Sequence, residues 1–123
     1  MMLEIAMNQI NVTNLEEAIT WYTEVLGFEL SKEHYYPPQA VDLIQKGGIR
    51  LLLYKVQKPT TINYPNQAQS LIIFRTTDLK QMMKELTDKG VEFLYSEVKE
   101  FPAGIFTAFK DPFGNVHEIV QFH

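Results

Sequence analysis

Cysteine is absent from the 123-residue chain, which excludes disulfides, thiolate metal sites and cysteine nucleophiles. Long hydrophobic runs are absent too. The longest, at 51–54 and 71–74, fall far short of the roughly 20 residues that a transmembrane helix needs. The N-terminus has no basic flank followed by an apolar core, so no signal peptide is visible. These absences predict a cytoplasmic protein without a membrane partner, because cysteine-free chains fit a reducing compartment.

A basic stripe is also missing. The net charge is −4, and the 11 Lys and Arg residues are interspersed with 15 Asp and Glu residues, so nucleic acid is not an expected partner. Neither a Gly-x-Ser-x-Gly elbow nor a glycine-rich phosphate loop is present. What remains is an ordinary composition, 46% hydrophobic and 21% charged, in a chain long enough for one domain with its own core.

The most informative feature is an internal repeat. Residues 11–18 align with 75–82 at a shift of 64, and each segment reads as a strand that runs into a helix. Asn14 and Asp78 are the expected N-cap residues, and a Glu or Gln follows three positions later, as in a capping box. The apolar residues that come next have helical spacing in both halves.

The two halves continue alike. A glycine follows each predicted helix, Gly27 and Gly90, where a left-handed residue is expected. Strand candidates follow at 28–30, 40–45 and 49–53 in the first half, and at 91–93, 105–110 and 116–120 in the second, with the last pair aligned at a shift of 67. We therefore predict an α+β fold of two βαβββ modules, 1–56 and 70–123, joined by a proline-containing linker at 57–69.

Two segments resemble a known family. Residues 14–28, N-L-E-E-A-I-T-W-Y-T-E-V-L-G-F, resemble the D-L-x-x-A-x-x-F-Y-x-x-V-L-G-F segment of the vicinal-oxygen-chelate superfamily, which includes glyoxalase I, extradiol dioxygenases and bleomycin-resistance proteins. Residues 111–118, D-P-F-G-N-V-H-E, resemble its closing D-P-x-G-N-x-x-E segment. The resemblance covers essentially the whole chain. It implies a single glyoxalase/bleomycin-resistance-like domain, in which two modules form a curved mixed sheet around a cleft, and commonly a homodimer.

In metal-dependent members, four ligands line the cleft, one from the first and one from the last strand of each module. The resemblance places these positions at Met7, Leu71, Leu51 and Glu118, of which only Glu118 is a usual ligand. Gln9 replaces Met7 if the register slips by two. His117 does not complete a site, because it adjoins Glu118 in a strand and points to the opposite face. His34, in a loop expected at 33–38, and His123, at the terminus, are expected at the surface. We therefore predict no metal and no other cofactor, and keep a divalent metal as the alternative.

Strand alternation predicts which residues share the cleft with those positions. The expected set is Met7, Gln9, Asn11, Leu51, Leu53, Leu71, Ile73, Arg75 and Glu118. The floor is thus mostly aliphatic, and its two charged members are expected to pair with each other or to orient a ligand. Aromatic walls are expected from Tyr35, Tyr36, Tyr54, Tyr64 and Phe113. In the alternative, the aliphatic side chains simply fill the cleft.

Three functions follow from this set. The first is metal-independent binding of a small apolar or aromatic molecule, as the resemblance to bleomycin-resistance proteins implies. The second is a metal-dependent glyoxalase-like lyase or dioxygenase. The third is a protein-interaction module without a ligand. We favour the first, because an apolar pocket with few polar groups is the usual composition of small-molecule sites.

Overall fold

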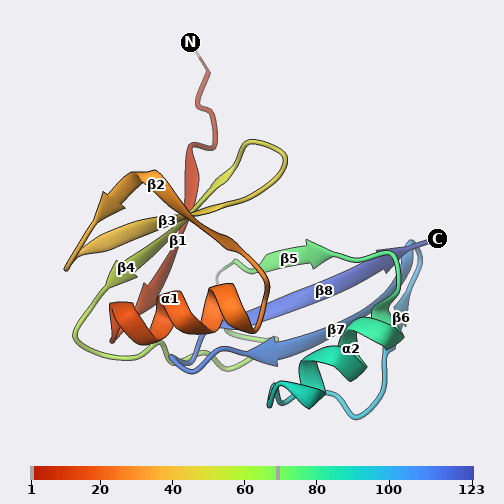
Figure 1. Cartoon of the computed structure of the whole chain (residues 1–123). Helices are drawn as coiled ribbons and strands as arrows, with labels where there is room; N and C mark the ends of the chain where they lie inside the picture. The colour runs from red at the N-terminus through yellow and green to blue at the C-terminus, as the bar shows by residue number, and fades with distance from the viewer. Residues whose placement is uncertain (1, 69) are drawn as a thin grey trace. The chain divides into compact units, whose positions relative to one another are not determined.

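A computed structural model describes residues 2–68 and 70–123, so Gln69 of the predicted linker lies outside the described residues. The chain divides into two compact units, Met1–Thr60 (unit 1) and Thr61–His123 (unit 2), and the division falls within the predicted linker. Each unit carries a helix and a four-stranded mixed sheet (Figure 1). The predicted α+β fold of two βαβββ modules is confirmed.

Unit 1 runs in the predicted order. Its elements are β1 (Met7–Val12), α1 (Leu15–Glu24), β2 (Glu29–Tyr36), β3 (Ala40–Ile44) and β4 (Arg50–Lys55). The sheet order is β1-β4-β3-β2, in which β1 and β4 are parallel and the other pairs antiparallel. The loop expected at 33–38 is wrong for residues 33–36, because β2 continues through His34 to Tyr36 and pairs there with β3.

Unit 2 repeats this topology. Its elements are β5 (Ile72–Arg75), α2 (Leu79–Asp88), β6 (Lys99–Phe101), β7 (Gly104–Lys110) and β8 (Val116–Phe122), in the sheet order β5-β8-β7-β6. The strand expected at 91–93 is wrong: only Phe93 forms a bridge there, with Phe109. The edge strand of this sheet is instead β6, because a tight turn between Phe101 and Gly104 aligns β6 directly with β7.

Both helices begin as their sequences predict. The Asn14 side chain accepts a hydrogen bond from the Glu17 N–H at 3.0 Å, and Asp78 accepts one from the Gln81 N–H at 3.1 Å, which satisfies backbone donors that a helix start leaves free. On α1, Tyr22 is fully buried, while its neighbour Trp21 is only half-buried. The two rings meet edge to face with centroids 4.9 Å apart.

Each sheet has a helix face, defined by its buried apolar residues, and an opposite face that we call the open face. In unit 1 the helix face carries Ile10, Val12, Leu43, Leu51 and Leu53. The placement of Leu51 and Leu53 beside Met7 and Gln9 is therefore wrong. Because Gln9 pairs with Leu52 and Ile73 pairs with Glu118, the counterpart of Glu118 is Leu52, one residue later than the repeat indicated.

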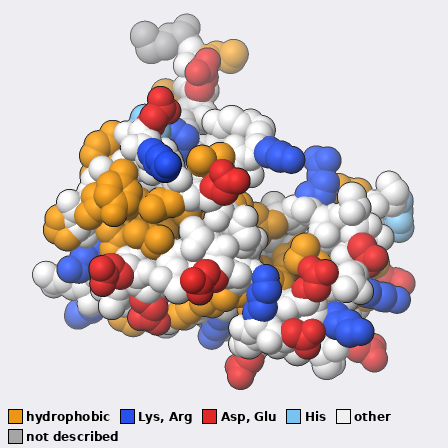
Figure 2. Space-filling model, viewed as in Figure 1, with side chains coloured by type: hydrophobic (Ala, Val, Ile, Leu, Met, Phe, Trp, Pro, Cys, Tyr) orange, Lys and Arg blue, Asp and Glu red, His pale blue; other side chains and the backbone are white. Residues whose placement is uncertain are grey.

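The surface carries charged side chains of both signs. In the view of Figure 2, acidic and basic side chains alternate over the molecule and form no continuous basic band. Among the described residues, no helix has the length and apolar character that crossing a bilayer requires.

Candidate functional site

Glu118 lies on the open face of unit 2. In the sheet it is aligned with Ile73 of β5 and Ala108 of β7. Arg75 lies on the same face, two residues from Ile73 and aligned with Val120. Leu71 directly precedes β5 and is half-buried. The register thus brings Ile73, Arg75 and Glu118 to one face of unit 2.

A tyrosine from the predicted linker reaches this face. The Tyr64 hydroxyl donates a hydrogen bond of 2.6 Å to Oε2 of Glu118. Burial raises the pKa of Tyr64 well above its usual value, and the hydrogen bond to Glu118 raises it further, because both oppose the charged phenolate. Tyr64 therefore stays protonated as a donor at ordinary pH. Glu118 thus has a protein partner on one of the oxygens that a metal would need.

The expected pairing of Arg75 with Glu118 is not found in the described part of the chain. The Arg75 guanidinium instead lies over the Phe122 ring, with its central carbon 5.7 Å from the ring centroid. This is a cation–π distance. The sheet explains the difference: Arg75 lies beside Val120, whereas Glu118 lies beside Ile73 and accepts its hydrogen bond from Tyr64.

Aromatic rings form a chain on unit 2. Edge-to-face contacts join Tyr64 to Tyr95 at 6.0 Å, Tyr95 to Phe106 at 6.2 Å and Phe106 to Phe101 at 5.7 Å between ring centroids. Phe101 continues the chain to Phe122 at 6.5 Å. The sequence predicted Tyr64 as a wall residue, and it gave no sign of the contacts that join Tyr95, Phe106 and Phe101 to it. The expected wall residue Phe113 is buried in the core of unit 2, with 3% of its surface exposed.

A hollow of about 300 Å³ opens beside Tyr64 and Tyr95 of this chain of rings. Its lining combines aromatic, aliphatic and polar residues with a single lysine: Ile62, Asn63, Tyr64, Pro65, Leu94, Tyr95 and Lys110. The Lys99 ammonium lies 4.9 Å from the centroid of the Tyr95 ring. Pockets of this size and mixed lining are at the small end of those that hold small molecules.

The open face of unit 1 is polar. It carries Met7, Gln9 and Asn11 of β1, and the Gln9 amide donates a hydrogen bond of 2.8 Å to Oδ1 of Asn11. It also carries an ion pair between Asp42 of β3 and Arg50 of β4. Sequence reasoning missed this pair. Only the antiparallel alignment of β3 with β4 brings the two residues together, and no local motif marks it.

The donor set does not fit a resident metal ion. The four family positions, with the corrected register, are Met7, Leu52, Leu71 and Glu118, and three of them offer no oxygen or nitrogen. Across the described residues, no group of three or more His, Asp or Glu side chains is placed to hold an ion. Of the four family positions, only Glu118 thus offers a ligand that suits a divalent metal.

The histidines do not supply the missing ligands. His117 is buried on the helix face between Phe74 and Phe109, with ring centroids 5.5 and 5.6 Å away. Burial lowers its pKa to about 4, although Asp111 opposes the shift. As expected from alternation, it points away from the face of Glu118. His34 is half-buried in β2, and His123 is exposed at the end of the chain.

These features define a vicinal-oxygen-chelate fold with an altered metal site. The chain belongs to the Glyoxalase/Bleomycin resistance protein/Dioxygenase superfamily, whose family model matches residues 4–119. It is 29% identical over 119 residues to the Bacillus subtilis (strain 168) protein YetH, covering 94% of this chain and 96% of that protein.

Solved structures agree with this assignment. A superfamily member from Sphaerobacter thermophilus DSM 20745 is 25% identical with a TM-score of 0.76, covering 98% of each chain. A glyoxalase/bleomycin resistance protein from Streptomyces sp. CB03234 is 26% identical with a TM-score of 0.68, covering 96% of this chain and 100% of that one.

Proposed function

We propose that this protein binds a small apolar or aromatic molecule without the help of a metal ion. The observation that carries the proposal is the environment of Glu118. One of its oxygens accepts a short hydrogen bond from Tyr64, and Tyr64 itself lines the hollow of unit 2. The residue that other family members use for a metal thus supports the wall of a pocket.

The chemistry of this wall favours a flat or apolar ligand. Tyr64 and Tyr95 present aromatic surface, Leu94 adds an exposed aliphatic side chain, and Lys110 adds a charge at the rim. Aromatic side chains bury much area on a ligand and lose few rotamers in doing so. The likeness to the Streptomyces protein, which carries the description glyoxalase/bleomycin resistance protein, supports the same class of function.

A thermal-shift panel tests the proposal. Metal-free bleomycin and 1-naphthol serve as probes, beside elemental analysis of the purified protein. A probe at 100 times its dissociation constant is expected to stabilise the protein by about 2.7 kcal/mol. Leu94→Glu should abolish this stabilisation, because it places a second charge in the hollow. The matched control is Ile44→Glu, at an exposed apolar position of unit 1.

Two results would overturn the proposal. One is a tightly held equivalent of a transition metal together with metal-dependent isomerisation of the methylglyoxal–glutathione adduct, which would establish the glyoxalase-like alternative. The other is a panel without any stabilising probe, which would favour the interaction module.

We also propose a homodimer. The side chains of Met2, Leu3 and Ile5 are 85%, 100% and 75% exposed. The N-terminal segment that carries them runs away from the sheet of unit 1 ahead of its edge strand β1 (Figure 1). An edge strand with exposed apolar residues beside it is a ready surface for a second copy. Light scattering at micromolar concentration should give twice the chain mass. Replacing Leu3 and Ile5 by serine should shift the population toward monomer, and a monomeric mass for the unaltered protein would contradict the proposal.

A further inference from the structure

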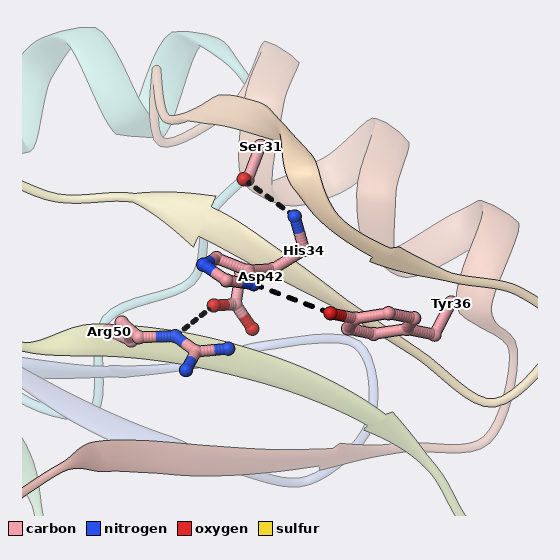
Figure 3. A network of polar contacts seen from close by, with 5 residues as sticks. All are labelled: Ser31, His34, Tyr36, Asp42 and Arg50. Carbon is pink, nitrogen blue, oxygen red and sulfur yellow. Dashed lines mark hydrogen bonds and ion pairs between the residues drawn. The ribbon is translucent and has the colours of Figure 1, made fainter.

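Asp42 is a buried carboxylate on the open face of unit 1. Only 2% of its surface is exposed. Its Oδ2 accepts a hydrogen bond from Nε of Arg50, while Oδ1 is buried and has no hydrogen-bond partner among the described residues (Figure 3). Among the described residues, the Asp42 side chain therefore makes one hydrogen bond, with Arg50.

The stability of the fold does not account for this pair. Removing the Asp42 carboxylate from water is costly, and apolar residues of similar volume often stabilise a sheet as well or better. A buried oxygen without a partner adds a further cost. What the pair does achieve is geometric: the guanidinium of Arg50 is held in one place by a carboxylate that is itself fixed within β3.

The ion pair with Asp42 does not use the terminal nitrogens of the Arg50 guanidinium. Asp42 engages Nε alone, and the two terminal nitrogens of Arg50 have no partner in the described part of the chain. The Arg50 side chain is 39% exposed, so this end is within reach of a solute. Two parallel N–H groups at the end of a guanidinium match the two oxygens of a carboxylate.

The surroundings suit a bound organic anion. From β2, His34 and Tyr36 turn toward the pair, and the Tyr36 hydroxyl lies 3.4 Å from Nδ1 of His34 (Figure 3). The amides of Gln9 and Asn11 lie on the same face in the neighbouring strand. This face therefore offers hydrogen-bonding groups and an aromatic ring around one oriented cation.

We propose that Arg50, positioned by Asp42, binds the carboxylate of a small-molecule ligand through its two terminal nitrogens. The inference goes beyond the proposed function, since it assigns a carboxylate-binding site that consists of unit 1 residues alone. Arg50 is the ligand-contacting residue and Asp42 is a positioning residue.

The chain offers an unusually clean test, because it contains only two arginines, Arg50 and Arg75. Their side-chain Nε–Hε groups give two signals in a proton–nitrogen correlation spectrum, which the Arg50→Lys and Arg75→Lys variants assign. Sodium benzoate is titrated at constant ionic strength, and benzamide serves as the neutral control of the same shape. We expect a saturable shift of the Arg50 signal with benzoate alone, while the Arg75 signal stays in place.

Two variants separate the roles. In Asp42→Asn the arginine remains but its anchor loses its charge, so the benzoate dissociation constant should rise roughly tenfold, as for the loss of one hydrogen bond to a charged group. Arg50→Lys keeps the charge but loses the paired N–H groups, so saturable binding should be lost. If the Asp42–Arg50 pair has a structural role alone, the unaltered protein should show no saturable benzoate binding. Because the decisive titration uses the unaltered protein, a variant that fails to fold does not remove the test.

Three outcomes would overturn the inference: an Arg50 signal that does not move, equal shifts of both arginine signals, or an equal response to benzamide. If the apolar panel still stabilises the protein in any of these cases, only the carboxylate assignment is wrong. If the panel and the benzoate titration both fail, the proposed function falls with it.

Discussion

Units 1 and 2 share a topology and differ in the chemistry of their open faces. On unit 1 the face carries amides and the Asp42–Arg50 pair, whereas on unit 2 it carries a chain of aromatic rings. Equivalent strand positions show the divergence directly, since Gln9 and Leu52 of unit 1 correspond to Ile73 and Glu118 of unit 2. The repeat thus constrains the backbone and the helix caps, and it leaves the open faces free to diverge.

The strongest test of this difference between the open faces is to remove one charge from each of them. Arg50→Leu leaves the buried Asp42 carboxylate without its partner and should clearly destabilise the protein, because an unpaired buried charge is strongly unfavourable. The double change Asp42→Leu with Arg50→Leu should recover most of that loss. Urea denaturation measures both effects.

The corresponding cycle in unit 2 is the control. No ion pair joins Arg75 to Glu118 among the described residues, so Arg75→Leu should cost less than about 1 kcal/mol, and its effect should add to that of Glu118→Leu within roughly 0.5 kcal/mol. Strong coupling of this second pair, or additive effects at Asp42 and Arg50, would reverse the contrast between the units.

A smaller difference concerns acid. At equivalent helix-face positions, unit 1 has Leu51 and unit 2 has His117, whose pKa is lowered to about 4 from an ordinary 6.5. Between these two pH values the unfolded chain binds a proton that the folded chain does not, so stability is lost as the pH falls from 6.5 toward 4. The expected loss between pH 7 and 5 is roughly 2 kcal/mol.

The variant His117→Leu, which gives unit 2 the residue of unit 1, should remove most of this loss. Denaturation at pH 7 and pH 5 compares the two proteins. An unchanged acid response in the variant would assign the pH dependence to groups other than His117.

A smaller effect than that of His117 is expected at Tyr64. Tyr64→Phe deletes the hydrogen bond to Glu118 and should cost about 1 kcal/mol, the usual net contribution of such a bond. Tyr35→Phe, at an exposed position of unit 1, is the matched control and should be neutral. Thermal melts at matched concentration measure both. A neutral Tyr64→Phe would mean that the tyrosine contributes its ring alone to the wall of the hollow.

Local signals in the sequence were sufficient for most of the fold. The caps Asn14 and Asp78 and the glycines Gly27 and Gly90, with φ of 81° and 90°, lie where helix chemistry requires them. The prediction of a strand at 91–93 was wrong, because an apolar segment after a helix does not reveal which later segment pairs more closely with β7.

The site depended on longer-range information. The parity of β1, β5 and β8 follows from alternation, but a one-residue difference between the repeats moved Leu51 and Leu53 to the other face. The partner of Glu118 lies 54 positions away in an irregular segment, so no periodicity marks it. Sequence alone therefore suggested the altered metal position and the wall residue Tyr64, and it missed the hydrogen bond that joins them.

The single tryptophan has a practical consequence for these measurements. Trp21 lies in α1 beside the buried Tyr22, so the intrinsic tryptophan fluorescence of the protein comes from unit 1 alone. Circular dichroism, by contrast, sums the backbone of both units. Superimposable denaturation curves from the two probes would mean that the duplicated halves melt as one cooperative block. A fluorescence transition that departs from the dichroism curve would mean that each half has a melting point of its own.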